Sequence, residues 1–457
     1  MNTGDRKSIL EKFLGLFSEV RHGEGTTALL LTLISFLILT SYYVLKPVRE
    51  ALILSDVGPE AKTYASVGQA LLLIVTVQIY SWLGTRLGRR SLINWVTLFF
   101  AACLVGFYVL GKAHVRLGLV FFLWVGIFNL VVVSQFWSFA NDVYTIERGQ
   151  RLFPIVAFGS SSGAVFGSFL ADRLFGPIGV FEFLLVADAI LILSLVLTNY
   201  VDHRERDQKK AMAAEKAVKA EEPIGKQGGF GLVFRKKYLL LIALLILFLN
   251  LVKTTGEYLL SRRVTETANQ LIREKAPEVS SKEEYIGKFY SEFFAAVNLL
   301  GMLAQLFLVS RVIKYLRVRG SILIYPIIAF LSYGLMAFYP ILSMIRAAKV
   351  AENATDYSLG NTVRNALFLP VTREEKYKAK QAIDTFFVRF GDVFSAGIVF
   401  AGTNWIILNT QQFAFTNLLF SLICLGLAFW VGTEYQRLSA RSEANNRTRN
   451  LQSAPSG

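Results

Sequence analysis

Long apolar stretches recur along the whole chain, separated by shorter charged segments. Each holds about twenty residues, the length that a helix needs to cross the hydrocarbon core of a bilayer, so the pattern predicts an all-α membrane protein with about twelve transmembrane helices. The expected spans are 26–46, 62–84, 91–111, 117–142, 151–171, 177–200, 237–260, 286–310, 319–341, 345–369, 378–402 and 410–433. Before them, Arg6–Val20 has apolar residues at helical spacing and predicts an amphipathic helix on the membrane surface.

The longest polar loop divides the chain into two halves. Loops on the same side as this linker and both termini hold a clear excess of Lys and Arg, which predicts that this side is cytoplasmic. We therefore expect a multi-pass protein of the cell inner membrane with both termini in the cytoplasm. The expected segments are a cytoplasmic N-terminal segment (1–25), a six-helix bundle (26–200), a cytoplasmic linker (201–236), a second six-helix bundle (237–433) and a cytoplasmic tail (434–457).

The two halves read as repeats of one another. Span 1 contains VLKPVREALI and span 7 contains LVKTTGEYLL, so that Lys46 aligns with Lys253 and Glu50 aligns with Glu257. Six-span repeats that run in the same direction are the plan of the major facilitator fold, whose halves expose a central site to each side in turn. The sequence therefore predicts a major facilitator-like protein built from two six-helix repeats.

Composition excludes several other classes of function. The net charge of +15 matches the excess of cytoplasmic Lys and Arg, so we expect no nucleic-acid partner. Cys103 and Cys424 lie inside apolar runs and the three histidines are far apart, so neither a disulfide, a metal site nor a cofactor is predicted. No phosphate-binding loop GxxxxGK[ST] or nucleophile motif occurs, so we expect no catalytic residues, and ATP would be cargo and not fuel.

Charged residues lie at the end of the first span. The run Thr26–Leu45 leads directly into Lys46, Pro47, Arg49 and Glu50. Proline interrupts a helix and frees backbone groups, and charges in a span usually face the inside of a bundle. This is a predicted cargo site; the alternative is that Lys46 and Arg49 extend to the lipid headgroups.

Spans 4 and 5 carry polar and small residues on defined faces. Gln135, Ser138 and Asp142 share one face of span 4, which predicts that this face points into a bundle. The glycines of 159–163, together with Gly167, recur every four residues in span 5, which favours close packing against a neighbouring helix over a chemical role.

Spans 7, 10 and 11 hold the largest number of charged residues. One face of span 10 is polar from Asn353 to Arg364, and such a face must line a wet cavity or a contact between helices. Lys253 and Glu257 lie one turn apart in span 7, so a simple pair between them is a second interpretation. The candidate site residues of these spans are Asn250, Lys253, Glu257, Asp356, Tyr357, Asn361, Arg364, Lys380, Asp384 and Arg389.

The cationic candidates point to an anionic cargo with several charges. Arg binds phosphate oxygens through paired hydrogen bonds and Lys binds them as a point charge. Aromatic residues of the same spans, Tyr42, Tyr43, Phe136, Trp137 and Tyr357, offer rings on which a planar base could stack. The alternative is that half or more of these charges form static pairs.

Three stretches, 42–54, 136–168 and 354–397, resemble the ATP/ADP translocase family of plastids and obligate intracellular bacteria, and especially its free-living bacterial relatives. The resemblance covers most of the membrane region, and its most specific part is Asp356–Gly397. It implies a twelve-span, facilitator-like fold that exchanges ATP for ADP or carries other nucleotides, sometimes with protons.

The resemblance also implies which residues contact the cargo. Carried over by motif, these are Arg49 in KPVRE, Asp142 in FAND, Lys253 in NLVK and Lys380 in KAKQAID. Typical exchangers have lysine at the position of Arg49 and glutamate at the position of Asp142, which keeps both charges. They have glutamate at the position of Lys253, where this chain has the opposite charge.

We therefore expect a secondary transporter that moves nucleotides, by ATP/ADP exchange or related transport. The alternative is a facilitator-type carrier of another anionic metabolite or a lipid headgroup. A membrane-embedded enzyme would need a nucleophile, a metal cluster or a phosphate loop, and the sequence offers none of them, so we expect no enzyme. A non-transporting scaffold would not need a charged face through span 10. The expected partners are the cargo and the lipid bilayer, and we expect a monomer.

Overall fold

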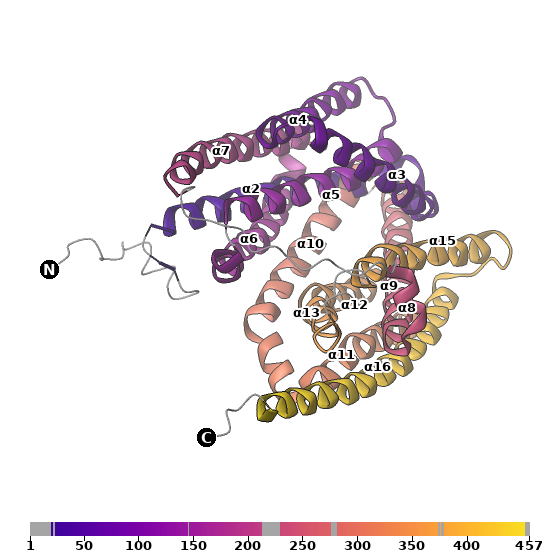
Figure 1. The fold of residues 1–457 in the computed structure, drawn as a ribbon. Coiled ribbons are helices and arrows are strands. Elements are labelled where there is room, and N and C mark those ends of the chain that lie inside the picture. Colours follow the sequence, from indigo (N-terminus) through magenta and orange to yellow (C-terminus); the bar gives the residue numbers. More distant parts are fainter. Residues whose placement is uncertain are drawn as a thin grey trace. The chain divides into compact units, whose positions relative to one another are not determined.

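The computed structural model describes residues 20–21, 23–144, 146–212, 229–275, 281–372, 375 and 379–452. Nearly all of the expected surface helix Arg6–Val20, and the middle of the expected linker, lie outside these residues. The helices of the first half are α2 (Gly25–Asp56), α3 (Gly58–Arg86), α4 (Arg89–Lys112), α5 (Gly118–Val143), α6 (Ile146–Ile178) and α7 (Glu182–Met212) (Figure 1).

The second half is also helical over its described residues. Its helices are α8 (Gly229–Arg235), α9 (Lys237–Arg273), α10 (Lys282–Phe307), α11 (Val309–Phe338), α12 (Leu342–Thr355), α13 (Asn361–Ala366), α14 (Lys380–Ala382), α15 (Val388–Asn404) and α16 (Thr410–Gln452). The π-helical segments η1 (Asp356–Gly360) and η3 (Ile383–Phe387) lie between these α-helices.

Within the described residues, 11 helices are long and apolar enough to cross a membrane, and each overlaps most of one expected span. The remaining expected span, 345–369, is formed by α12, η1 and α13, which follow one another without a break. This segment differs from the 11 apolar helices because η1 contains a widened turn and α12 carries charged residues. The rod from Leu342 to Ala366 still measures about 37 Å at about 1.5 Å per residue, which is enough to cross a bilayer.

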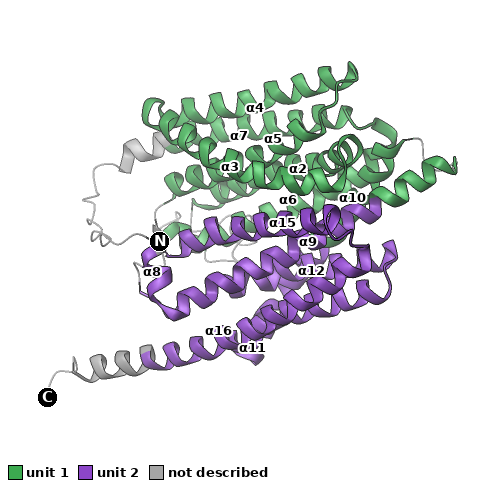
Figure 2. Cartoon of the chain, turned by 90° about the vertical axis from the view of Figure 1, so that its right-hand side faces the viewer, with its two compact units in different colours: residues 1–219, 265–298 green, residues 220–264, 299–457 purple. Residues whose placement is uncertain are grey.

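The chain forms two compact units, which Figure 2 shows in green and purple. Unit 1 consists of residues 1–219 and 265–298, and unit 2 consists of residues 220–264 and 299–457. Helix α3 of unit 1 exposes Leu71, Ile74 and Val75 by 64%, 51% and 52%, as expected for a helix that faces lipid tails.

Helix α2 is at the centre of unit 1 and packs against α5, α6 and α7. Its contact with α6 is close because three glycines of α6 face its backbone. A Cβ atom on Gly159, Gly163 or Gly167 would lie 2.3, 2.2 or 2.6 Å from a backbone carbonyl oxygen of α2. The prediction that these small residues permit close helix packing is confirmed.

In unit 2, α11 packs along α16 and against α12. Helix α11 is interrupted at Arg317, where φ is 55° and ψ is 177°. Helix α15 approaches α9 closely, since a Cβ atom on Gly391 would lie 2.7 Å from the Leu247 carbonyl oxygen. These contacts bring the charged residues of α9, α12 and α15 into the interior of unit 2.

Candidate functional site

A buried carboxylate in unit 1 forms ion pairs with two cationic side chains. Glu50 of α2 is 2% exposed, and its two oxygens lie 2.5 Å from Arg49 Nη2 and 2.6 Å from Lys62 Nζ. Lys62 comes from the first turns of α3, which follows α2 after a single residue, so the tight connection places these side chains together. The group carries more positive than negative charge.

Lys46 adds a third cation to the same face of α2, one helical turn before Glu50. Its ammonium lies 4.0 Å from the ring centre of Phe294 and 4.9 Å from that of Tyr43, both within unit 1. The residue is 7% exposed, so it does not extend to a lipid headgroup. Cation–π contacts of this kind stabilise an ammonium inside a protein. We call Lys46, Arg49, Glu50 and Lys62 the unit 1 charge group.

The structure does not bring Asp142 to this group. Its carboxylate lies 3.5 Å from Arg89 Nη1 and is 56% exposed, and Arg89 also binds Asp202. The start of α5 contacts the end of α2, where the Gly118 N–H donates to Asp56 over 2.7 Å. Asp142, at the other end of α5, is therefore separated from Lys46 by roughly 20 Å along the helix axes.

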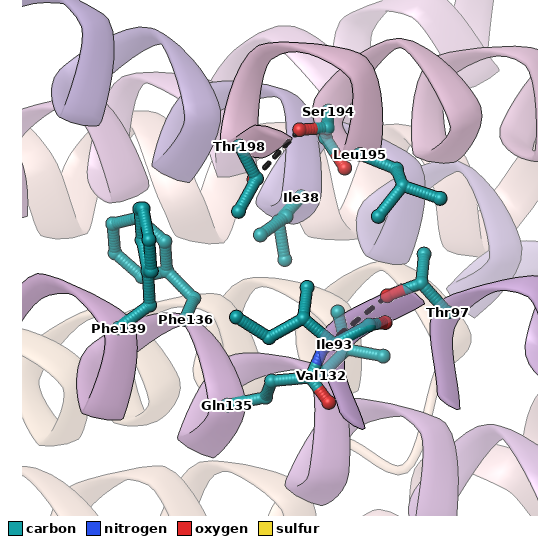
Figure 3. Close-up of a pocket in the computed structure, with 10 residues that line it drawn as sticks. All are labelled: Ile38, Ile93, Thr97, Val132, Gln135, Phe136, Phe139, Ser194, Leu195 and Thr198. Carbon is teal, nitrogen blue, oxygen red and sulfur yellow. Dashed lines mark hydrogen bonds between the residues drawn. The ribbon is translucent and has the colours of Figure 1, made fainter. Parts of the chain in front are cut away.

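The polar face of span 4 holds helices together. Gln135 is 4% exposed and donates to the Ile93 carbonyl oxygen over 3.3 Å and to Thr97 Oγ1 over 3.2 Å, both on α4. These residues line a cavity of about 20 Å³ among α2, α4, α5 and α7 (Figure 3). The cavity has room for about one water molecule and is too small for a nucleotide.

Lys253 of α9 binds across unit 2 to Asp356. Lys253 Nζ lies 2.5 Å from Asp356 Oδ2, and Arg364 Nη2 lies 3.4 Å from Asp356 Oδ1. The Lys253 ammonium is also 4.9 Å from the ring centre of Tyr357, whose ring is accessible because the residue is 39% exposed. We call Lys253, Asp356, Tyr357 and Arg364 the unit 2 charge group.

A second lysine, Lys349 of α12, is fully buried in unit 2. Its ammonium lies 2.8 Å from Glu352 Oε2 and 3.4 Å from Glu257 Oε1. Asn353 Nδ2 donates to the same Glu257 oxygen over 2.9 Å. Lys253 and Glu257, which the sequence allowed as a pair, therefore each have a partner on α12 or η1.

Asn250 and Arg389 converge on Asp392 of α15. Asn250 Nδ2 donates to Asp392 Oδ1 over 2.7 Å and Thr254 Oγ1 donates to it over 2.8 Å, while Arg389 Nη1 donates to Oδ2 over 3.2 Å. Asp392 is 8% exposed. Both carboxylate oxygens of Asp392 therefore accept hydrogen bonds, and we interpret the cluster as a structural contact between α9 and α15.

The remaining predicted residues lie on exposed parts of unit 2. Lys380 Nζ donates to Asn365 Oδ1 over 2.8 Å and lies 4.0 Å from Asp384 Oδ2. Asn365 Nδ2 donates to the Asn361 carbonyl oxygen over 2.9 Å. Asp384 lies in the π-helical segment η3 and Asp356 begins η1, and such segments often mark functional positions in helices.

Lys62 and Lys349 are partners that the sequence did not single out. Both lie near the start of a helix in the sequence pattern, where a lysine usually reaches the aqueous surface. Their burial comes from tertiary packing. The sequence could have indicated these two lysines through Glu50 and Glu352, the carboxylates to which no cation had been assigned. In the described part of the chain, no group of three or more His, Cys, Asp or Glu side chains could hold a metal ion.

Comparison with known proteins identifies relatives over most of the chain. The family description "TLC ATP/ADP transporter" matches residues 119–439. ADP,ATP carrier protein 1 of Chlamydia pneumoniae is 22% identical over 305 residues, 58% of this chain and 56% of the carrier. The chain thus matches about half the length of that carrier. ADP,ATP carrier protein 5 of Rickettsia bellii is 20% identical over 523 aligned positions, 96% of this chain and 100% of the relative.

Solved structures share the fold. An auto-inhibited POT family peptide transporter has a TM-score of 0.60 at 12% identity and covers 90% of this chain and 97% of its own. The nucleoside transporter NupG has a TM-score of 0.57 at 11% identity and covers 90% of this chain and 98% of its own. The predicted major facilitator-like membrane fold is confirmed.

Proposed function

Because the chain belongs to the TLC ATP/ADP transporter family, we propose that it is a secondary transporter that moves nucleotides across a membrane by alternating access. ATP/ADP exchange is the form of this activity that we propose first, since two relatives matched above are named ADP,ATP carriers. The proposal treats nucleotides as cargo.

One observation supports the proposal most strongly, the unit 1 charge group. It holds Arg49 and Lys62 at the carboxylate of Glu50, and Lys46 lies one helical turn away over the ring of Phe294. A phosphate chain accepts charge-assisted hydrogen bonds from arginine and lysine side chains of this kind.

The unit 2 charge group suits the other features of a nucleotide. Lys253 and Arg364 share Asp356, which a phosphate can replace as their acceptor. The accessible ring of Tyr357 offers a surface for an adenine base. The other predicted site residues position the helices of unit 2 in this proposal: Asn250, Glu257, Asn361, Lys380, Asp384 and Arg389. Asp142 of unit 1 positions Arg89, with which it forms an ion pair.

We further propose that the protein acts as a monomer in the bacterial inner membrane with both termini in the cytoplasm. The distribution of Lys and Arg among the loops supports this orientation.

The test is the thermal stability of the purified protein with equal concentrations of ATP, ADP, AMP, adenosine or glycerol phosphate. A ligand that binds only the folded state stabilises it by about 2.7 kcal/mol at a hundred times its Kd. We expect ATP and ADP to raise Tm most, AMP less and adenosine least. Equal effects of adenosine and ATP, or stabilisation by glycerol phosphate alone, would contradict the proposal.

A further inference from the structure

A groove of unit 2 lies between α11 and α16, which pack along each other (Figure 2). Its volume is about 740 Å³, which is within the range of ligand-binding clefts. The groove combines a polar wall with an apolar wall. The polar wall includes Arg317, Arg319, Tyr435 and Gln436, and the apolar wall includes Leu316, Leu323 and Phe429. The groove shares no residue with the unit 1 or unit 2 charge group.

The interruption of α11 at Arg317 brings two arginines into the groove. Residues that lie two apart in an α-helix point about 200° apart, so Arg317 and Arg319 would occupy opposite faces of a continuous helix. The backbone of Arg317 has φ 55° and ψ 177° and leaves the helical path, and both arginines line the groove. Residues other than glycine rarely adopt this conformation, and residues held in it cluster at functional sites.

The partners of Arg319 in the groove are neutral. Arg319 Nη1 donates to Gln436 Oε1 over 2.6 Å, and its guanidinium carbon lies 5.9 Å from the ring centre of Phe429. Both Arg317 and Arg319 are exposed. In the part of the chain that the structure describes, neither arginine forms an ion pair with a carboxylate. The groove therefore presents two positive charges to an external anion.

The equivalent contact in unit 1 contains a carboxylate. Helices α4 and α7 are the third and sixth spans of the first half, as α11 and α16 are of the second half. Arg89 at the start of α4 binds Asp202 of α7 and also lies 3.5 Å from Asp142. Gln436 of α16 stands where unit 1 has Asp202. The same helix contact is thus closed by an acid in unit 1 and by a neutral amide in unit 2.

We propose that this groove binds an anionic phospholipid, whose phosphate lies at Arg317 and Arg319. Helices α11 and α16 are both long and apolar enough to cross a membrane, and basic residues near the end of a membrane helix lie at the level of the lipid headgroups. Arginine binds phosphate oxygens through paired hydrogen bonds. The bound lipid joins α11 to α16.

The apolar wall distinguishes a lipid from a soluble phosphate compound. Leu316 and Phe429 are 50% and 52% exposed, so an acyl chain can cover them while the phosphate contacts the arginines. A nucleotide has phosphates but no hydrocarbon chain for this wall. The proposal does not depend on nucleotide transport, because the groove is separate from both charge groups.

Native mass spectrometry of the purified, delipidated protein at graded concentrations of phosphatidylglycerol tests the proposal. The site variant is Arg317→Gln/Arg319→Gln. The matched control Arg311→Gln/Arg437→Gln removes the same charge from the same two helices, and neither of its residues lines the groove. We expect the control to bind phosphatidylglycerol like the wild type and the site variant to bind it about tenfold more weakly or worse, since charge-assisted hydrogen bonds are lost.

Four results would overturn the proposal. The first is that the wild type binds no phosphatidylglycerol, and the second is that the site variant and the control have equal affinities. The third is that phosphatidylcholine, which has no net charge, binds as tightly as phosphatidylglycerol. The fourth is that ATP displaces the lipid, which would assign the groove to a nucleotide. None of the first three results would affect nucleotide transport.

If the site variant does not fold, Gln436→Glu decides the question, since it keeps both arginines. The new carboxylate can accept the same hydrogen bond from Arg319 Nη1, so the contact between the helices is preserved. It also gives Arg319 the kind of partner that Arg89 has in Asp202. We expect a several-fold loss of affinity for phosphatidylglycerol. Affinity equal to that of the wild type would overturn the proposal.

Discussion

Lysines inside membrane helices need an acceptor at close range, and the structure supplies one for two lysines of unit 2. Lys253 has Asp356 and Lys349 has Glu352. Sequence analysis predicted Lys253 and Asp356 as site residues but could not pair them, because the two lie far apart in the chain. It did not predict Lys349, since burial of a lysine depends on the surrounding helices.

The pair of Lys253 and Asp356 is tested by a charge swap. Lys253→Glu places a carboxylate beside Asp356 and Glu257, so we expect a lower Tm and loss of nucleotide uptake. Removing one partner of a buried pair costs about 3–5 kcal/mol, and less here because Lys253 is 25% exposed. The double variant Lys253→Glu/Asp356→Lys should recover part of the Tm, measured by differential scanning fluorimetry. A double variant no more stable than Lys253→Glu would contradict the pairing.

Arg49 provides the corresponding test in unit 1. A hydrogen bond to a charged group contributes about 1.5–3 kcal/mol, so Arg49→Ala should weaken ATP binding by about ten- to a hundredfold. Arg116→Ala, an exposed arginine between α4 and α5, is the matched control and should bind like the wild type. Equal affinity of both variants in titration calorimetry would remove Arg49 from the site.

Glu24, just before α2, gives a prediction about pH. Burial would raise its pKa, but hydrogen bonds from Arg151 and the Arg21 backbone, with the charges of Arg151 and Arg148, lower the pKa below 4.5 overall. The folded state therefore gains stability from ionised Glu24 above the unfolded pKa, and loses it as pH falls through the folded pKa. Between pH 6 and about pH 4, the Tm of the wild type should fall more than that of Glu24→Gln. Parallel Tm curves for the two proteins would contradict this assignment.

At the scale of the element, packing of α2 against α6 depends on the glycines of α6. Their spacing of four residues was visible in the sequence, because small residues that recur at this interval share one helix face. The partner helix was not visible, since periodicity describes a face and not what covers it. Likewise, the polar residues of span 10 were found by periodicity, whereas the π-helical turn at Asp356 changes that periodicity and arises only in the folded helix.

Gly163→Ala tests the helix contact. Its Cβ would lie 2.2 Å from the Phe36 carbonyl oxygen, and overpacking of this kind typically costs about 1–3 kcal/mol. We expect a Tm several degrees below that of the wild type. Gly106→Ala on α4 is the matched control, because no atom lies within 4 Å of its added Cβ, and it should leave Tm unchanged or slightly higher. Equal Tm values for the two variants would contradict close packing of α2 on α6.

At the scale of the whole molecule, hydropathy was sufficient to predict the membrane-spanning helices and the facilitator-like fold. The length of each apolar stretch shows whether it can span the membrane, and this can be read from contiguous residues of the sequence. The division of charges into cargo-binding and structural groups is not local. Asn250 and Arg389 both donate to Asp392, while Arg49 and Lys62 share the Glu50 carboxylate. Only the three-dimensional arrangement distinguishes the two cases.

The central claim is that the protein exchanges nucleotides, and counterflow in liposomes tests it most directly. Purified protein is reconstituted into vesicles preloaded with unlabelled ADP or with buffer alone, and labelled ATP is added outside. We predict rapid uptake that requires internal ADP. A folded protein that takes up no ATP above the level of empty vesicles, with or without internal ADP, would contradict the account.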